Sequence, residues 1–180
     1  MKTPKHHSAA HGTRRAALGS ALFLCLAPGT VAGVAPWLLT RWRIEPATSA
    51  FDRAAKALGA ILIAAGAVML VSAFVHFVTK GRGTPAPVAP THALVVQGAY
   101  RHVRNPMYLS VTATIVGQAL LLGRPALVAY AAAVAGAMAT FVYLYEEPTL
   151  AARYGQRYEL YCVAVPRWRP RLRPWKPNHR

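Results

Sequence analysis

Acidic residues are scarce in this chain, and cysteine is nearly absent. Only five Asp and Glu stand against 21 Lys and Arg, which gives a formal net charge of +16. Two cysteines cannot form a disulfide framework in 180 residues, so a disulfide-stabilised scaffold is excluded. Charged residues make up 14% of the chain and hydrophobic residues 54%, which is too apolar for intrinsic disorder. The length fits a single domain.

Four stretches contain no Lys, Arg, Asp or Glu at all. Each has 19 to 25 residues, and they cover positions 16–40, 57–79, 105–123 and 125–145. A helix needs about 20 apolar residues to cross the hydrocarbon core of a bilayer. We therefore expect an all-α integral membrane protein with about four transmembrane helices. The Gly-Arg-Pro turn at 123–125 predicts that the last two form an antiparallel helical hairpin.

Basic residues are distributed unevenly between the predicted loops. Sixteen of the 21 Lys and Arg lie on one side if both termini are cytoplasmic, and the positive-inside rule favours that orientation. This distribution explains the positive charge without nucleic acid, and the Arg-, Trp- and Pro-rich tail 166–180 suits a headgroup surface. An alternative for the first stretch is a cleaved twin-arginine export signal, because Arg14 and Arg15 precede it.

Two of the five acids stand side by side where the fourth stretch ends. Glu146 and Glu147 are followed by Pro148, which predicts the end of the helix. The helix macrodipole disfavours carboxylates at that end by about 0.3–1 kcal/mol each. Carboxylates placed where the macrodipole disfavours them indicate a binding or catalytic site. The alternative is that the pair only neutralises Arg101, Arg104 or the basic tail.

A second polar cluster precedes the third stretch. Its members are Tyr100, Arg101, His102, Arg104, Asn105, Pro106 and Tyr108. In a hairpin, the start of the third helix lies beside the end of the fourth, so we expect this cluster to meet the Glu pair. A helix N-terminus offers free backbone N–H groups to a carboxylate, and the Glu pair suits an ammonium group or ribose hydroxyls. The alternative is an interfacial belt of aromatic and arginine side chains.

Three further patterns complete the expected organisation. Tyrosines at 154, 158 and 161, with two leucines, predict a short C-terminal interfacial helix after Pro148 that either closes over the site or only anchors the chain. Ala132, Gly136 and Thr140 predict a small-residue packing face. His76 is a further candidate because ionisable groups in membrane spans are often functional. No metal-ligand spacing is present, so no metal is expected.

The ordered combination of these motifs resembles a known superfamily. The loop 81–87, Tyr100, the segment 104–108 and the motif 146–148 resemble the isoprenylcysteine carboxyl methyltransferases and phospholipid N-methyltransferases. The segments 154–161 and 165–168 are similar to bacterial members. In the family pattern a histidine occupies the position of Asn105. The resemblance implies an integral membrane enzyme that uses S-adenosylmethionine.

The resemblance and the residue patterns together lead to a set of predicted site residues and a division of the chain. Catalytic roles are predicted for Glu146, Glu147 and His102. The predicted cofactor-binding residues are Tyr100, Arg104, Asn105, Pro106, Tyr108, Gly81, Gly83 and the same two glutamates. A role in the substrate and tail region is predicted for Tyr158, Tyr161, Arg167 and Trp168. The chain is divided into a basic N-terminus (1–15), a first span with its loop (16–56), a methyltransferase-like core (57–165) and the tail (166–180).

The predicted activity is transfer of a methyl group to a lipidic or hydrophobic small-molecule acceptor, at a carboxylate or an amine. The cofactor already carries an activated methyl, so the protein mainly has to position the reactants and exclude water. We expect a bacterial cytoplasmic membrane protein whose partners are the bilayer and that substrate, without nucleic acid or an obligate protein partner. The alternative is a non-enzymatic transporter or assembly factor that uses the Glu pair for ion pairing.

Overall fold

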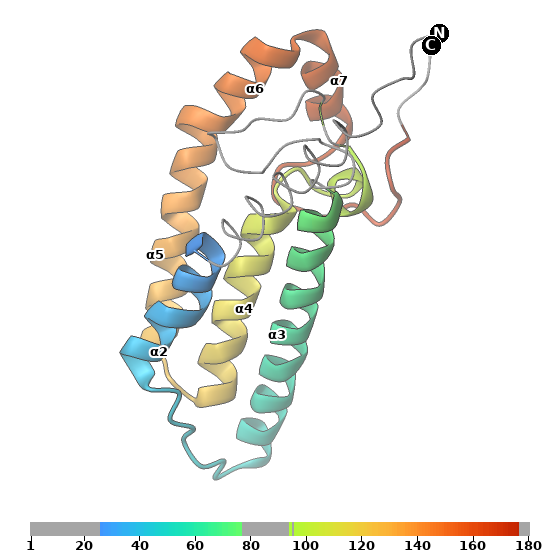
Figure 1. The fold of residues 1–180 in the computed structure, drawn as a ribbon. Helices are drawn as coiled ribbons and strands as arrows, with labels where there is room; N and C mark the ends of the chain where they lie inside the picture. Colours follow the sequence, from blue (N-terminus) through green and yellow to red (C-terminus); the bar gives the residue numbers. More distant parts are fainter. Residues whose placement is uncertain (1–25, 77–93, 95, 177–180) are drawn as a thin grey trace, which may run out of the picture.

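The computed structural model describes residues 26–76, 94 and 96–176, and these are helical without any β-strand (Figure 1). The all-α prediction is therefore confirmed for the described part of the chain. The predicted N-terminal segment 1–15, with Arg14 and Arg15, lies outside the described residues, as do Gly81 and Gly83. The elements are η1 (Thr30–Val34), α2 (Ala35–Thr40), α3 (Ala50–His76), η3 (Gly98–Arg101), α4 (Pro106–Leu122), α5 (Ala126–Phe141), η4 (Val142–Glu146), α6 (Glu147–Tyr154) and α7 (Gln156–Ala164).

Two helical stretches in the described ranges are long and apolar enough to cross a membrane. They are Ala50–Ala73 and the continuous helix Ala126–Tyr154. The other two charge-free stretches contain shorter apolar helices, Leu26–Thr40 and Pro106–Leu122. These lengths fit a membrane protein.

Helix α3 begins well before the charge-free stretch that predicted it. Ser49 and Asp52 form a reciprocal capping pair: the Ser49 amide donates to Asp52 Oδ2 over 2.9 Å, and the Asp52 amide donates to Ser49 Oγ over 3.0 Å. This capping arrangement satisfies backbone donors at the first turn. The helix therefore starts at Ala50 and includes Arg53 and Lys56, although the charge pattern had assigned both to a loop.

Helices α3 and α4 meet backbone to backbone at two glycines. A Cβ atom built on Gly117 would lie 2.7 Å from the Gly59 carbonyl oxygen, and one on Gly59 would lie 2.6 Å from the Gly117 oxygen. Small residues allow such close helix contacts. In the described part of the chain the packing face predicted on α5 stays open, because Gly136, like Ala132 and Thr140, is exposed and a Cβ on it meets nothing within 4 Å.

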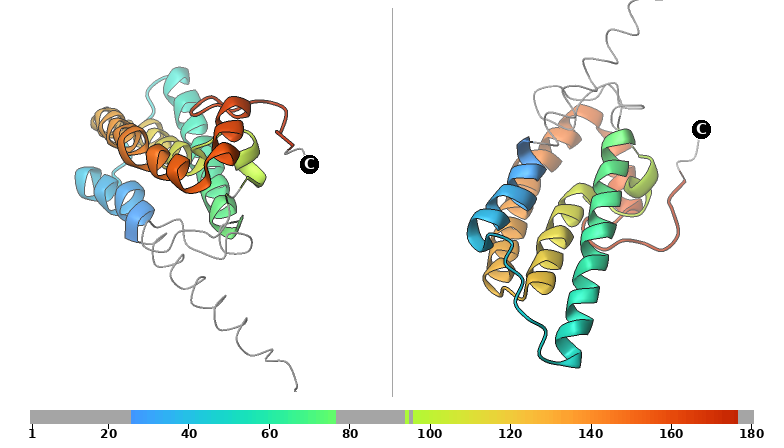
Figure 2. Two further views of the ribbon diagram at one scale, coloured as in Figure 1. Left: turned by 90° about the horizontal axis from the view of Figure 1, so that it is seen from above. Right: turned by 60° about the horizontal axis from the view of Figure 1, so that its bottom comes forward.

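Helix α4 packs against α3 on one side and α5 on the other (Figures 1 and 2). Gly123 ends α4 in the left-handed conformation at φ 69°, and a short turn leads directly into α5. The buried side chains of Ile115 and Leu127 contribute to the core between them.

The first helix is attached to this core by side-chain hydrogen bonds. Gln118 Nε2 donates to the carbonyl of Ala32 over 2.6 Å, and Tyr130 donates to the carbonyl of Val31 over 2.9 Å. The Trp42 indole donates to Gln118 Oε1 over 3.2 Å, beyond the end of α2. The Gln118 side chain therefore connects α4 to η1 and to Trp42, which follows α2.

The prediction that the fourth helix ends at Pro148 is wrong. The chain continues from α5 through the π-helical turn η4 into α6 (Figure 1). Proline is tolerated in a first helical turn, and the wider π turn accommodates its missing N–H. The predicted single interfacial helix is instead two helices, α6 and α7, because Gly155 turns the chain at φ 51°.

Candidate functional site

Glu146 and Glu147 lie at the junction between α5 and α6. Glu146 is the last residue of η4, and Glu147 is the first residue of α6. A π turn adds a residue to the helical repeat, so it rotates the side chains that follow, and such turns are frequent at functional sites. The expected penalty for carboxylates at a helix C-terminus does not apply, because the helix continues past them.

The opposite wall of the site is the start of α4. Asn105 precedes this helix, and its side chain does not cap it. Its Nδ2 instead donates to the carbonyl of Arg167 over 3.2 Å. Pro106 occupies the first turn of α4 and is fully buried, so it sets the direction of the helix and offers no side-chain polar group.

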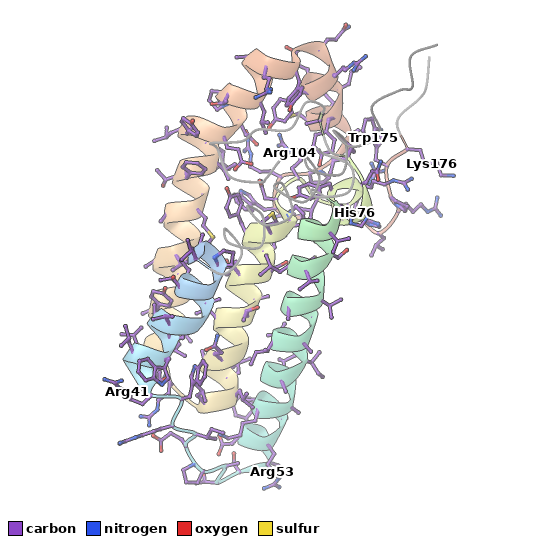
Figure 3. All side chains as sticks on the ribbon, in the orientation of Figure 1. Arg41, Arg53, His76, Arg104, Trp175 and Lys176 are labelled. Carbon is purple, nitrogen blue, oxygen red and sulfur yellow. The ribbon has the colours of Figure 1, made fainter. Side chains whose placement is uncertain are left out.

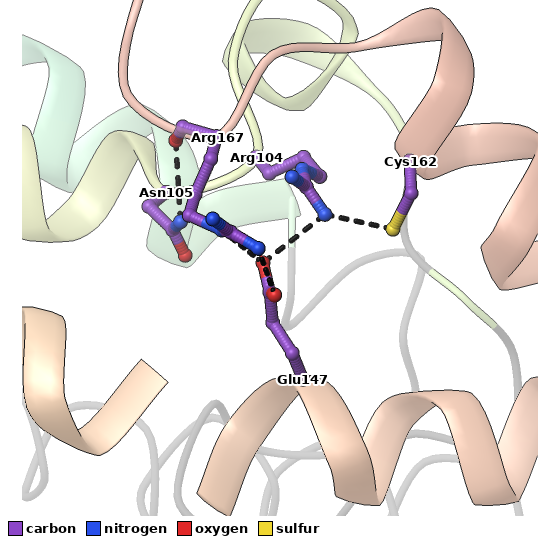
Figure 4. Close-up of polar contacts among 5 residues, drawn as sticks. All are labelled: Arg104, Asn105, Glu147, Cys162 and Arg167. Carbon is purple, nitrogen blue, oxygen red and sulfur yellow. Dashed lines mark hydrogen bonds and ion pairs between the residues drawn. The ribbon is translucent and has the colours of Figure 1, made fainter. Parts of the chain in front are cut away.

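Arg104, Glu147 and Arg167 form the site ion cluster (Figure 4). Arg167 binds both oxygens of Glu147: Nε lies 2.7 Å from Oε1, and Nη2 lies 2.5 Å from Oε2. Arg104 Nη1 lies 3.1 Å from the same Oε1. The guanidinium of Arg167 also lies 4.1 Å from the ring centroid of Tyr143, and its hydrogen bonds to Glu147 raise the pKa of Arg167. One carboxylate therefore faces two guanidinium groups.

Arg104 has donors directed to two sides. Its Nη1 donates to Sγ of Cys162 over 2.7 Å as well as contacting Glu147. Its Nε is buried and has no hydrogen-bond partner among the residues that the structure describes. An unpaired buried donor on a charged group is costly, so this atom marks a place for an acceptor.

Glu146 has a different environment from Glu147. The phenol of Tyr108 donates to Glu146 Oε2 over 2.7 Å. The ion pairs found in the described ranges do not include Glu146. The structure thus brings the two predicted polar clusters together, with Arg104 on Glu147 and Tyr108 on Glu146.

The strap, residues 165–176, follows the segment 101–104 by backbone hydrogen bonds. The Arg104 amide donates to Pro166, the Arg171 amide to His102 and the Trp175 amide to Arg101, over 2.9 Å in each case. Arg104 and Trp175 lie at the same end of the molecule (Figure 3). The prediction of a tail that lies only on lipid is incomplete, because the strap is also one wall of the site.

The two tyrosines of α7 point inward, toward the other residues at this end of the molecule. Tyr158 and Tyr161 are buried in a cluster with Val165 that also includes Trp175. Tyr161 donates to the carbonyl of Tyr100 over 2.7 Å. Burial raises the pKa of Tyr100, Tyr158 and Tyr161, so all three phenols stay protonated at neutral pH. This face of α7 therefore supports the strap, and the predicted role of Tyr158 and Tyr161 in the substrate and tail region stays a prediction.

The remaining predicted residues are not part of the ion cluster. His102 Nδ1 lies 2.7 Å from the Arg171 carbonyl, which can only accept, so the ring holds the strap through an Nδ1–H donor. Trp168 is half-buried on the strap. His76 Nδ1 lies 2.7 Å from the carbonyl of Ser72, one turn back in α3. Among the described residues, no group of His, Cys, Asp and Glu could hold a metal ion.

Several contributors to the site were not anticipated from the sequence. Tyr143 stacks on Arg167, and Cys162 accepts from Arg104. The Arg-, Trp- and Pro-rich pattern marks the tail as unusual. Its basic residues indicate contact with lipid headgroups, however, and not backbone hydrogen bonds to residues 101–104. No local pattern marks Tyr143, because its position depends on the π turn.

The site places positively and negatively charged side chains close together. The ion cluster has an excess of positive charge and an unpaired Arg104 donor, whereas Glu146 offers a carboxylate bound only to a phenol in the described part of the chain. Such a pair of environments suits a ligand that carries both an anionic and a cationic group. A shallow depression on α6, lined by Pro148, Thr149, Ala152 and Arg153, includes none of these groups.

A comparison with protein families yields one match. The family described as phospholipid methyltransferase matches residues 54–157, which include α4, α5, both glutamates and the start of α7. No curated protein and no solved structure matches the chain.

Proposed function

The chain belongs to the phospholipid methyltransferase family and is a membrane methyltransferase, and we propose that it transfers a methyl group from S-adenosylmethionine at the site between α4, α6 and the strap. The acceptor that we propose is a lipid or another hydrophobic small molecule with a carboxylate or an amine. The observation that carries the proposal is the meeting of Arg104, Glu147 and Glu146 in one site.

The residues of the site fit the charge pattern of this cofactor. Its methionine part carries a carboxylate and an ammonium group, and its ribose carries hydroxyls. The unpaired Nε of Arg104 suits the carboxylate, and the Glu146 carboxylate suits the ammonium group or a hydroxyl. When bound, the cofactor supplies the activated methyl. Tyr100 and Tyr108 are the aromatic residues closest in sequence to the start of α4, and we propose that they contribute to the same cofactor site.

The protein's own contribution is positioning and exclusion of water. The strap covers the start of α4 through its hydrogen bonds to 101–104, which would keep solvent from the ion cluster. An amine acceptor must lose a proton before or during transfer. Glu146 is the better candidate to accept it, because Glu147 is held by two guanidinium groups and His102 is bound to the strap.

We extend the proposal to topology and location. Four spans with both termini in the cytoplasm, in a bacterial cytoplasmic membrane, agree with the charge distribution and with the apolar character of all four helices. Residues 57–165 would form the methyltransferase core, with the bilayer and the acceptor as partners. The family match does not favour the alternative of a non-enzymatic transporter or assembly factor.

Calorimetric titration of S-adenosylmethionine into the detergent-purified protein tests the proposal. Glu146→Gln removes the carboxylate that, in the described part of the chain, is bound to Tyr108 and not to an arginine. Glu159→Gln is the matched control, because it removes one negative charge from the exposed side of α7. We expect binding by the wild type and by the control, and at least tenfold weaker binding by Glu146→Gln, which corresponds to about 1.4 kcal/mol.

Two results would contradict the proposal. A folded wild type that does not bind S-adenosylmethionine would exclude this cofactor. Equal binding by all three proteins would place the cofactor away from Glu146.

A further inference from the structure

Three large apolar side chains on α7 and the strap are exposed although they lie outside the candidate spans. Leu160 is 60% exposed, Val163 is 90% exposed and Leu172 is 97% exposed. Leu160 and Val163 are three positions apart, so they share one face of α7. The opposite face carries the buried Tyr158 and Tyr161. The exposed side chains therefore do not belong to the core of this end.

A hydrogen bond connects the strap to α7 beside two of these side chains. Arg171 Nη1 donates to the carbonyl of Ala164 over 2.6 Å, which holds the strap against the end of α7. Val163 and Leu172 are the immediate neighbours of these two residues in the chain. We call Leu160, Val163 and Leu172, with the basic residues around them, the α7–strap surface.

The exposed charges of α6, α7 and the strap are almost all positive. The exposed basic residues of α6, α7 and the strap are Arg153, Arg157, Arg169, Arg173 and Lys176. Glu159 is the exposed acid in the same segments. Trp175 and Lys176, at the end of the strap, lie far from Arg41 and Arg53 at the other end of the bundle (Figure 3).

We propose that the α7–strap surface docks on an anionic lipid headgroup layer. The candidate span Ala126–Tyr154 ends directly before α7, so this surface lies where the chain leaves the bilayer. Apolar side chains flanked by arginines are the combination that inserts below headgroups while cations meet lipid phosphates. The occupant is anionic lipid and not zwitterionic lipid alone, because five exposed cations face one exposed acid.

Docking of this kind would also hold the strap in place. The strap carries Arg167, whose guanidinium binds Glu147. Insertion of Leu172 into the headgroup layer would therefore restrain the same segment that covers the ion cluster.

An environment-sensitive fluorophore tests the proposal in the full-length chain. Cys25 and Cys162 are replaced by serine, and a nitrobenzoxadiazole label is attached at Leu172→Cys, or at Val163→Cys as a second position. The protein is placed in nanodiscs of phosphatidylcholine alone or with phosphatidylglycerol. We expect emission at shorter wavelength when phosphatidylglycerol is present, and loss of that difference at high salt.

Charge variants separate this surface from a general attraction of a basic protein. Arg169→Gln with Arg173→Gln should abolish the phosphatidylglycerol-dependent shift. Arg41→Gln with Arg53→Gln removes the same charge at the other end of the bundle and should leave the shift unchanged. A label that stays in water in both lipids at both positions would overturn the proposal, as would equal loss of the shift in both double variants. Neither readout depends on cofactor binding or on methyl transfer.

Discussion

Replacing Arg167 by Gln should loosen the strap without unfolding the helices. Arg167 makes two charge-assisted hydrogen bonds to Glu147, each contributing about 1.5–3 kcal/mol when buried. Its side chain is 30% exposed, so solvent screening lowers the contribution of the whole pair toward the value of an exposed ion pair, about 1 kcal/mol. The contact with Tyr143 adds about 0.5–1 kcal/mol. Arg104 remains to pair with Glu147, so no carboxylate is left alone. We expect a loss of about 2 kcal/mol in the free energy that opposes strap opening.

Hydrogen exchange in detergent measures this opening directly. The amides of Arg171 and Trp175 donate to His102 and Arg101, so they exchange only when the strap leaves the segment 101–104. A loss of about 2 kcal/mol should speed their exchange about 30-fold. The amide of Ile115, in the middle of α4, should not change.

Arg169→Gln is the control, because it removes an exposed arginine from the same strap. It should leave the exchange of both strap amides unchanged. The reasoning is refuted if Arg167→Gln leaves those two amides unchanged, or if the amide of Ile115 accelerates by the same factor.

Three further substitutions give separate tests. Gly117→Ala should destabilise the protein by about 1–3 kcal/mol in thermal unfolding, because its Cβ would lie 2.7 Å from the Gly59 oxygen. Gly136→Ala should be neutral or slightly stabilising, and equal effects of the two substitutions would disprove the glycine contact. Tyr108→Phe should weaken S-adenosylmethionine binding about fivefold, or about 1 kcal/mol, through loss of its bond to Glu146, and unchanged calorimetric affinity would exclude that role. Gln118→Leu should cost about 1–3 kcal/mol in unfolding because it removes both bonds to the first helix, and a stability equal to wild type would contradict this attachment.

The helical fold class and the two polar clusters that meet at the site could be predicted from the sequence. Stretches without charge predict long apolar helices, since a bilayer or a core excludes unpaired charges. The acidic pair was conspicuous because acids are rare in this chain, and the Gly-Arg-Pro turn brought Tyr108 and Arg104 to the same end as Glu146 and Glu147.

Helix ends and long-range contacts were not predictable in the same way. The start of α3 depends on a capping pair between Ser49 and Asp52, which a count of charges misreads as a loop. The passage of the helix through Pro148 depends on the π turn directly before it. The strap pairs backbone groups about 70 residues apart, such as Arg171 and His102, and side-chain patterns carry little information on such pairing.

The inward orientation of the α7 tyrosines has a similar cause. A helix with tyrosines on one side and Leu160 and Val163 on the other has two amphipathic interpretations. Tyrosine is typical of membrane interfaces, so the sequence alone does not say which side faces the protein. Tertiary packing against Val165 and Trp175 buries the tyrosine side and leaves the aliphatic side outward.

Transfer of a labelled methyl group tests the central claim most directly. The protein in lipid nanodiscs is incubated with S-adenosylmethionine labelled at the methyl carbon, and the lipid and small-molecule extract is then analysed for label. The account predicts labelled extract with the wild type and with Glu159→Gln. With Glu146→Gln, the amount of label transferred should fall at least about 100-fold. A folded, membrane-inserted wild type that transfers no label to extracts containing lipid carboxylates and amines would contradict it.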